Sequence, residues 1–155
     1  MSAVGRIIQL SVSTGGIPKY AIEDALVTSL GLEGDAHRDR VHHGGPDRAV
    51  CLFAMEAIRA LQAEGHSLGP GALGENVTVE GIDWSAVQPG ARLSLGEEVV
   101  VEVTRFTTPC LNIRPAFRDS DYTRVSHKRY PGRSRVYARV VSTGMLRRGD
   151  VARLL

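Results

Sequence analysis

Residues 92–105 read RLSLGEEVVVEVTR, two apolar runs separated by Leu95-Gly96-Glu97. The second run places Val99, Val101 and Val103 two residues apart, the spacing at which side chains share one face of a β-strand. Because a glycine-containing turn joins the two runs, we expect a β-hairpin with one buried face.

Short apolar runs elsewhere in the chain have the same character. Candidate strands cover residues 5–12, 25–30, 48–53, 76–80 and 135–141, and a last one follows Gly149-Asp150. One helix is expected over residues 54–64, where Met55, Ile58 and Leu61 recur at helical spacing before Gly65. About seven short strands and few helices predict a mainly β fold, a barrel with helical decoration, rather than a parallel α/β sheet.

The length and composition narrow the class of protein. The chain has 155 residues, which predicts a single domain over residues 1–155. Apolar residues make up 43% and charged residues 23%, a composition typical of globular proteins. No apolar run is long enough to span a membrane, and two distant cysteines do not form a disulfide framework. We therefore expect a cytoplasmic protein without a membrane partner.

Charge is unevenly distributed along the sequence. Residues 1–104 carry seven Lys or Arg against fourteen Asp or Glu, whereas residues 105–155 carry twelve against three. The basic third either faces an anionic small molecule or pairs with the acidic part of its own chain. The sequence pI of 8.7 is modest and no nucleic-acid motif is present, which argues against a nucleic-acid partner.

A polar, glycine-rich loop is expected over residues 31–47. Its histidines and carboxylates suggest either a divalent metal site or a general base, although the spacing matches no standard zinc motif. A catalytic histidine or a phosphate-binding arginine is the favoured interpretation, because Gly44-Gly45 lets backbone amides approach an anion. A second loop precedes Glu75 and Asn76, which either satisfy backbone groups or face a ligand. Lys19 reads as an isolated loop lysine.

Cys110 is the most informative single residue. It follows Thr107-Thr108-Pro109, a sequence typical of a helix start, which would place the thiol in a first helical turn near two arginines. Such an environment favours the reactive thiolate. Cys51 lies in an apolar run and is expected to be buried and inert.

Six short motifs in this order resemble the MOSC family, named for the C-terminal domain of molybdenum-cofactor sulfurase. The matching pieces are Gly34-Asp35 with His37, His43-Gly44-Gly45 with Arg48-Ala49-Val50, Gly74-Glu75-Asn76, Gly90 before residues 92–95, Thr108-Pro109-Cys110, and Ser134 to Val140 with Gly149-Asp150. They extend over nearly the whole chain.

The resemblance implies a MOSC-type β-barrel and a function centred on Cys110. The matching cysteine in the family either ligates the molybdenum of a pterin cofactor or carries sulfur, and pyridoxal phosphate binding is a further association. We therefore expect Cys110 as catalytic residue and metal ligand, with His43 as its catalytic partner. The expected cofactor-binding residues are Lys19, Asp35, His37, Gly44, Gly45, Arg48, Glu75, Asn76, Asn112, Arg135 and Tyr137.

The resemblance leaves several functions open. The first is a molybdenum-cofactor (molybdopterin) protein or sulfur carrier that acts on N-hydroxylated compounds with a separate electron or sulfur donor protein. The second is an enzyme that needs no cofactor and uses Cys110 as nucleophile and His43 as base on a small sulfur compound, for example in carbon–sulfur bond cleavage. The third is a cofactor-binding module without catalysis.

Overall fold

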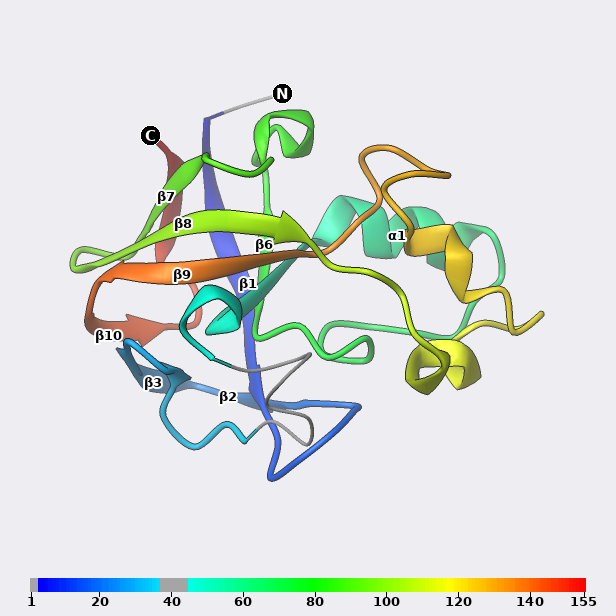
Figure 1. Cartoon of the computed structure of the whole chain (residues 1–155), viewed down its shortest axis with the longest axis horizontal. Helices are drawn as coiled ribbons and strands as arrows, with labels where there is room; N and C mark the ends of the chain where they lie inside the picture. The colour runs from blue at the N-terminus through cyan, green and yellow to red at the C-terminus, as the bar shows by residue number, and fades with distance from the viewer. Residues whose placement is uncertain (1–2, 37–44) are drawn as a thin grey trace.

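The computed structural model describes residues 3–36 and 45–155 and has a mainly β architecture (Figure 1). The strands are β1 (Val4–Val12), β2 (Tyr20–Ile22), β3 (Asp24–Thr28), β4 (Gly31–Leu32), β5 (Val50–Ala54), β6 (Val77–Glu80), β7 (Arg92–Leu95), β8 (Val99–Phe106), β9 (Val136–Ser142), β10 (Gly144–Arg147) and β11 (Val151–Leu154). The helices are α1 (Met55–Ala63) and four short 3-10 turns, η1 (Pro46–Arg48), η2 (Trp84–Ala86), η3 (Leu111–Ala116) and η4 (Tyr122–Val125).

The hairpin expected from residues 92–105 is present as β7 and β8. Leu93 pairs with Val101 and Leu95 with Val99 across the two strands. Val99, Val101 and Val103 are all buried, and the intervening side chains are more exposed. The alternation in the sequence therefore corresponds to one core-facing and one outward-facing side of the strand.

Seven strands close into a barrel. The order around the ring is β11-β7-β8-β9-β5-β6-β1, and β1 pairs with β11 to complete it. β1 supports this closure because its first residues pair with β11 while its middle pairs with β6. The barrel confirms the fold class expected from the sequence.

One parallel strand pair interrupts the antiparallel pattern. β5 runs into α1 and the chain returns through β6, which lies parallel to β5. The helix packs on the barrel through Ala57, Ile58 and Leu61, the face indicated by the apolar spacing. A single β-α-β unit thus occurs within a fold that lacks the regular alternation of an α/β protein.

Three short strands form a separate sheet in the order β10-β3-β4. The sequence indicated only the middle strand, because β4 and β10, like β2, are too short to show an alternating pattern. No helix in the described ranges is both long and apolar enough to cross a membrane.

Residues 111–134, which we call the strap, form most of the connection between β8 and β9 and include η3 and η4. In Figure 1 the yellow and orange strap lies beside α1, away from the barrel strands. Ile113, Phe117 and Val125 of the strap are buried in the core. The strap begins directly after Cys110 and ends directly before Arg135.

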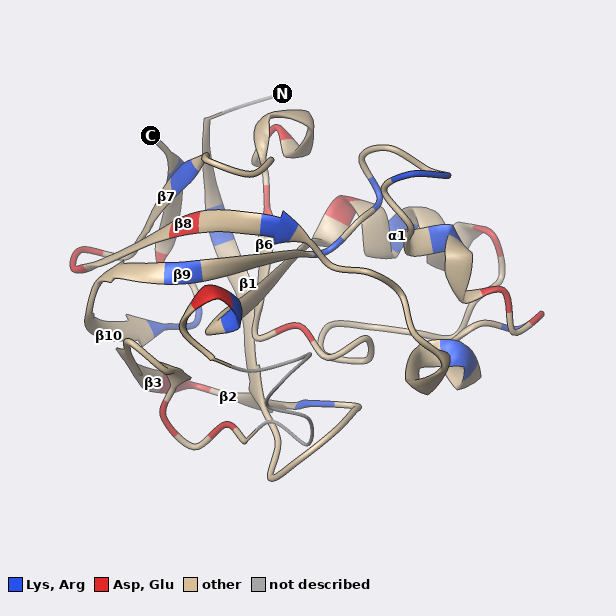
Figure 2. Ribbon diagram, viewed as in Figure 1, with Lys and Arg blue, Asp and Glu red and all other residues tan. Residues whose placement is uncertain are grey.

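Several ion pairs connect the basic C-terminal third to the acidic part of the chain. Arg139 contacts Glu102 at 3.2 Å, and Figure 2 shows the acidic segment of β8 beside the basic segment of β9. Arg148 contacts Glu23, and two strap arginines contact Glu64. Internal pairing therefore accounts for part of the charge asymmetry in the sequence.

Gly31 allows β4 to lie against the start of β5. Its φ is +114°, and a Cβ at this position would lie 2.2 Å from the carbonyl oxygen of Ala49. Gly31→Ala is expected to lower the free energy of unfolding by about 3 kcal/mol, through backbone strain and overpacking. Gly90→Ala is the matched control, because its φ is +94° with no atom near the added methyl. Chemical denaturation measures both, and equal losses would contradict the steric argument.

Candidate functional site

A pocket of about 220 Å³ lies where the strap, β5 and β9 meet the loops around β1 and β6. Its lining residues are Gly16, Ile17, Lys19, Ala36, Cys51, Leu73, Gly74, Asn76, Cys110, Asn112, Ile113, Arg135 and Tyr137. Polar and apolar side chains from distant parts of the sequence thus share one concave surface, the usual form of a small-molecule site.

Cys110 lies at the pocket wall and is partly exposed. Its backbone is extended and precedes η3, which begins at Leu111. The expectation that the thiol lies in the first turn of a helix was wrong, because Cys110 is the extended cap residue and the 3-10 turn begins one residue later. The Cys110 carbonyl accepts a hydrogen bond from Ile113 N at 3.2 Å, so the start of the strap fixes its backbone.

Cys51 belongs to the same pocket but is almost fully covered. It lies on β5 opposite Tyr137 of β9, and its Sγ is 3.9 Å from the Thr107 hydroxyl. Burial raises the pKa of the Cys51 thiol to about 11, although the nearby Arg135 charge opposes the rise. The thiol therefore stays protonated at neutral pH.

Arg135 is the most unusual polar group of the pocket. The residue is almost fully buried, with a relative exposure of 5%. Nη1 donates to the Leu73 carbonyl at 2.6 Å, whereas Nε and Nη2 have no hydrogen-bond partner among the described residues. A buried guanidinium with two unused donors is costly unless an anion or water completes its bonds.

Lys19 and Asp35 form a buried ion pair beside the pocket. Lys19 Nζ lies 2.6 Å from Asp35 Oδ2, and the two side chains are only 7% and 2% exposed. Asp35 also accepts hydrogen bonds from Ser13 N and from the Asn76 amide, at 3.0 and 2.9 Å. The structure therefore corrects the picture of Lys19 as a solvated loop lysine, because Asp35 draws it inward.

The side chain of Asn76 holds three parts of the barrel together. Its Oδ1 accepts from Cys51 N at 3.0 Å, and its Nδ2 donates to Ser11 O and to Asp35. Asn76 faces the pocket, but its amide nitrogen is already used for these contacts. The geometry makes Asn76 a positioning group for Cys51 and Asp35.

Tyr137 lines the pocket, whereas Arg48 and Glu75 lie next to residues that line it. Burial raises the pKa of the Tyr137 hydroxyl, and the Arg48 guanidinium carbon lies 5.9 Å from its ring centre. Glu75 is fully buried, and burial raises the pKa of its carboxyl while Gly71 and other donors oppose the rise. Among the described residues, neither Arg48 nor Glu75 lines the pocket itself.

Five further predicted residues remain, of which one lines the pocket, one lies at η1 and three fall outside the described ranges. Asn112 lines the pocket at its exposed rim, whereas Gly45 lies at the start of η1. His37, His43 and Gly44 fall outside the described residues. Within residues 3–36 and 45–155, no group of three His, Cys, Asp or Glu side chains is placed to hold a metal.

Sequence reasoning missed several wall residues. Ile17, Leu73 and Ile113 supply apolar wall, and Cys51 supplies a second thiol. Cys51 is separated from Cys110 by 59 positions in the sequence, so no local pattern joins them. Only the pairing of β5 with β9 indicates that Cys51 and Tyr137 are neighbours.

The two thiols are expected to react very differently with iodoacetamide. With its pKa raised to about 11, Cys51 has about one thousandth of its molecules as thiolate at pH 8, and burial limits access further. Cys110 should therefore be the first and dominant site of labelling in the native protein. Mass spectrometry of peptides after timed alkylation measures both, and equal labelling of Cys51 at pH 8 would contradict this assignment.

The pocket combines a partly exposed thiol with a buried cation that has spare donors. The thiol is a soft ligand or a nucleophile once deprotonated. The guanidinium suits a planar or tetrahedral oxyanion. Together they can hold a small anionic molecule with one end on Arg135 and a reactive end near Cys110.

The chain is similar in sequence to two curated proteins. It is 31% identical to the uncharacterized protein YflK of Bacillus subtilis over 146 residues, covering 93% of this chain and 64% of YflK. It is 32% identical to the protein YiiM of Escherichia coli over 102 residues, covering 63% of this chain and 45% of YiiM. The chain therefore spans less than two thirds of the length of each.

Solved structures show the same fold. The crystal structure of YiiM from Escherichia coli has a TM-score of 0.69 at 23% identity, over 97% of this chain and 69% of that chain. The YUAD protein of Bacillus subtilis has a TM-score of 0.76 at 16% identity, over 97% and 95%. The sequence also matches the family model of the MOSC domain over residues 39–153. The chain belongs to the MOSC domain family.

Proposed function

We propose that the protein binds a molybdopterin-type cofactor in this pocket, with Cys110 as its thiolate ligand. The observation that carries the proposal is Arg135, whose buried guanidinium has two donors without a partner among the described residues. The MOSC domain is associated with the molybdenum cofactor in general, and that cofactor carries a phosphate.

The residues present fit such a group. Arg135 Nε and Nη2 would hold phosphate oxygens, while Nη1 stays on the Leu73 carbonyl. Lys19 adds positive charge at the pocket wall, although Asp35 already neutralises part of it. Cys110 lies on the same surface as a soft sulfur ligand, the type that suits molybdenum.

The bound cofactor would supply a metal centre for oxygen-atom or electron transfer. The protein's own residues would orient it: Arg135 fixes one end, Cys110 the other, and Ile17 and Ile113 exclude water from the wall between them. Asn76 holds Asp35, which in turn holds Lys19 in place. With the cofactor bound, the protein would reduce N-hydroxylated compounds.

The proposal includes a separate electron or sulfur donor protein. Leu111, next to Cys110, is a large apolar residue with 61% of its surface exposed. Arg105 and Arg114 are also exposed on the segments leading to and from Cys110. Such a surface suits an acidic donor.

A second candidate is a sulfur carrier or a cofactor-independent cysteine enzyme acting on a small sulfur compound. The presence of two thiols on one pocket favours it, since Cys110 would carry or attack sulfur beside the protonated Cys51. Pyridoxal phosphate, the other family association, would need a free lysine amine, whereas Lys19 is engaged by Asp35.

Elemental analysis of the protein purified from a host that makes molybdenum cofactor distinguishes the two. Near-stoichiometric molybdenum, with a fluorescent pterin released on oxidation, supports the first candidate. Metal-free protein without pterin overturns it and leaves the thiol-only candidate, which alkylation-sensitive turnover of a small sulfur compound then tests.

A further inference from the structure

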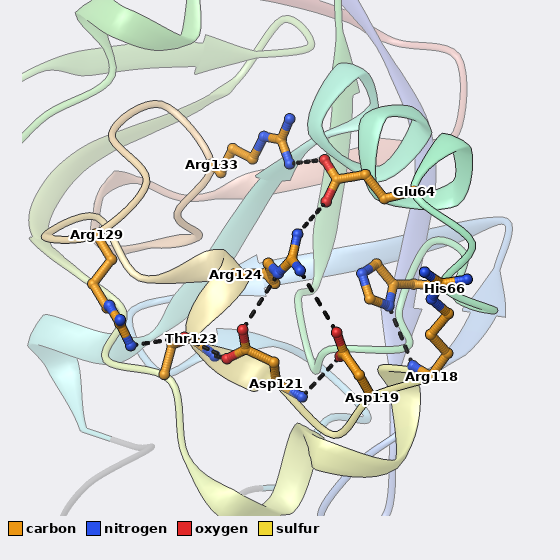
Figure 3. Close-up of polar contacts among 9 residues, drawn as sticks. All are labelled: Glu64, His66, Arg118, Asp119, Asp121, Thr123, Arg124, Arg129 and Arg133. Carbon is orange, nitrogen blue, oxygen red and sulfur yellow. Dashed lines mark hydrogen bonds and ion pairs between the residues drawn. The ribbon is translucent and has the colours of Figure 1, made fainter.

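The strap joins the two groups on which the proposed function rests. It starts after Cys110 and ends before Arg135, so a displacement of the strap acts on both. Its middle contacts Glu64 and His66, which follow directly after α1 (Figure 3). The contacts at this attachment are mainly ionic and use residues that no other part of the site requires.

Glu64 is the centre of this attachment. Its Oε1 lies 2.8 Å from Arg124 Nη1, and its Oε2 accepts a hydrogen bond from Arg133 Nη1. The hydrogen bond from Arg133 holds the pKa of the Glu64 carboxyl below its usual range, so the group is charged at neutral pH. One carboxylate thus binds two arginines that are nine residues apart in the strap.

Arg124 extends the contact into a network. Its guanidinium also faces Asp121 at 3.3 Å and Asp119 at 3.6 Å, as the dashed lines in Figure 3 show. Its carbon lies 5.9 Å from the ring centre of Tyr130. A network holds a geometry better than an isolated surface pair does.

His66 and Gly65 form the second part of the attachment. Arg118 N donates to His66 Nδ1 at 3.2 Å, and the Phe117 ring meets the imidazole edge-on at 5.2 Å. A Cβ on Gly65 would lie 2.9 Å from Arg118 Nη1. The Arg118 side chain of the strap therefore lies directly against Gly65, which follows the C-cap of α1. The strap is therefore seated closely on this helix end.

The route from this attachment to the pocket is short. Arg124 belongs to η4, which packs against η3, and η3 follows Cys110 directly. Arg133 lies two residues before Arg135. We infer that Glu64 is a positioning residue, which sets the strap and thereby the placement of Cys110 and Arg135 in the pocket.

Ile113, Phe117 and Val125 anchor the strap in the core, and we expect them to keep it folded when the Glu64 charge is removed. Loss of the Glu64 charge should therefore loosen the position of the strap rather than unfold the protein. This inference deepens the proposed function, on which it rests for the roles of Cys110 and Arg135. Its test uses thiol labelling and needs no cofactor, so the two can fail separately.

The experiment compares iodoacetamide labelling of Cys110 and Cys51 in the wild type and in Glu64→Gln. We expect Glu64→Gln to raise the labelling rate of Cys110 about threefold, the effect of an ionic contact of modest strength. Cys51, buried on β5, reports global unfolding and should label at an unchanged slow rate. Glu64→Asp, which keeps the charge, should restore most of the wild-type rate.

Glu80→Gln is the matched control. It removes the 2.9 Å ion pair between Glu80 of β6 and Arg59 of α1, neither of which belongs to the strap. It should leave Cys110 labelling unchanged. Raised ionic strength should increase Cys110 labelling in the wild type and add little in Glu64→Gln, because the screened contact is already absent there.

Two results would overturn the inference. An unchanged Cys110 rate in Glu64→Gln would show that the carboxylate does not position the strap. A parallel rise of Cys110 and Cys51 would show global destabilisation instead. Absence of bound molybdenum in the wild type would reject the proposed cofactor and leave this comparison of rates valid.

Discussion

Cys110→Ser is expected to lower the molybdenum content of the purified protein more than about 100-fold, since even indirect contacts to a metal ligand cost 10- to 100-fold. The exchange replaces a soft sulfur with a hard hydroxyl that is not deprotonated at neutral pH. Cys110 is partly exposed, so the exchange should leave the fold intact. Elemental analysis and pterin fluorescence on protein from a cofactor-producing host measure the effect.

Cys51→Ala is the control for this experiment. It removes the other thiol of the same pocket, which burial keeps protonated. This variant should retain most of its molybdenum. If Cys110→Ser keeps metal and pterin, the thiol is not the ligand, and the proposed role of Cys110 is wrong.

Arg135→Met is expected to lower cofactor content by about 100-fold, because two charge-assisted hydrogen bonds to an anion are lost at about 1.4 kcal/mol each. Methionine keeps much of the buried volume but has neither charge nor donors. Arg135→Lys should recover part of the loss, since it keeps the charge without the planar fork. The pterin content of the purified variants, with thermal melts as a check on folding, measures this.

Arg139→Met is the matched control, because Arg139 lies on β9, which starts directly after Arg135. Arg139 is partly exposed and pairs with Glu102 on the outside of the barrel. The variant Arg139→Met should keep its cofactor content within about twofold of the wild type, as expected for the loss of a surface pair. Equal losses in both variants would show that the loss of positive charge matters and not the two donors of Arg135 that lack a partner among the described residues.

The fold was largely predictable because the alternation of apolar and polar residues along a strand can be seen in a short stretch of sequence. Val99, Val101 and Val103 share a face in the sequence and in the barrel. The helix expected at 54–64 is confirmed as α1. What the sequence did not show was the parallel return through β6, since the direction of pairing depends on contacts between distant segments.

The candidate site was predictable only in part, for the same physical reason. Cys110, Arg135 and Tyr137 were identified from their motifs, and the structure brings them to one pocket. Lys19 was interpreted as solvated because its partner Asp35 lies 16 residues away, with β2, β3 and β4 between them. The helical start was placed too early, because capping signals leave the end of an element uncertain by about one or two residues and Cys110 is itself the cap.

The closure of the barrel has a consequence for how the chain is made. Val4 to Arg6 pair with β11, whereas Leu10 to Val12 pair with the nearby β2, so the first residues of β1 have no partner on this edge until the ribosome has released β11. An unpaired strand edge invites association with other chains. The barrel therefore stays open between β1 and β11 until residues 151–154 have been made, and it can close only after that.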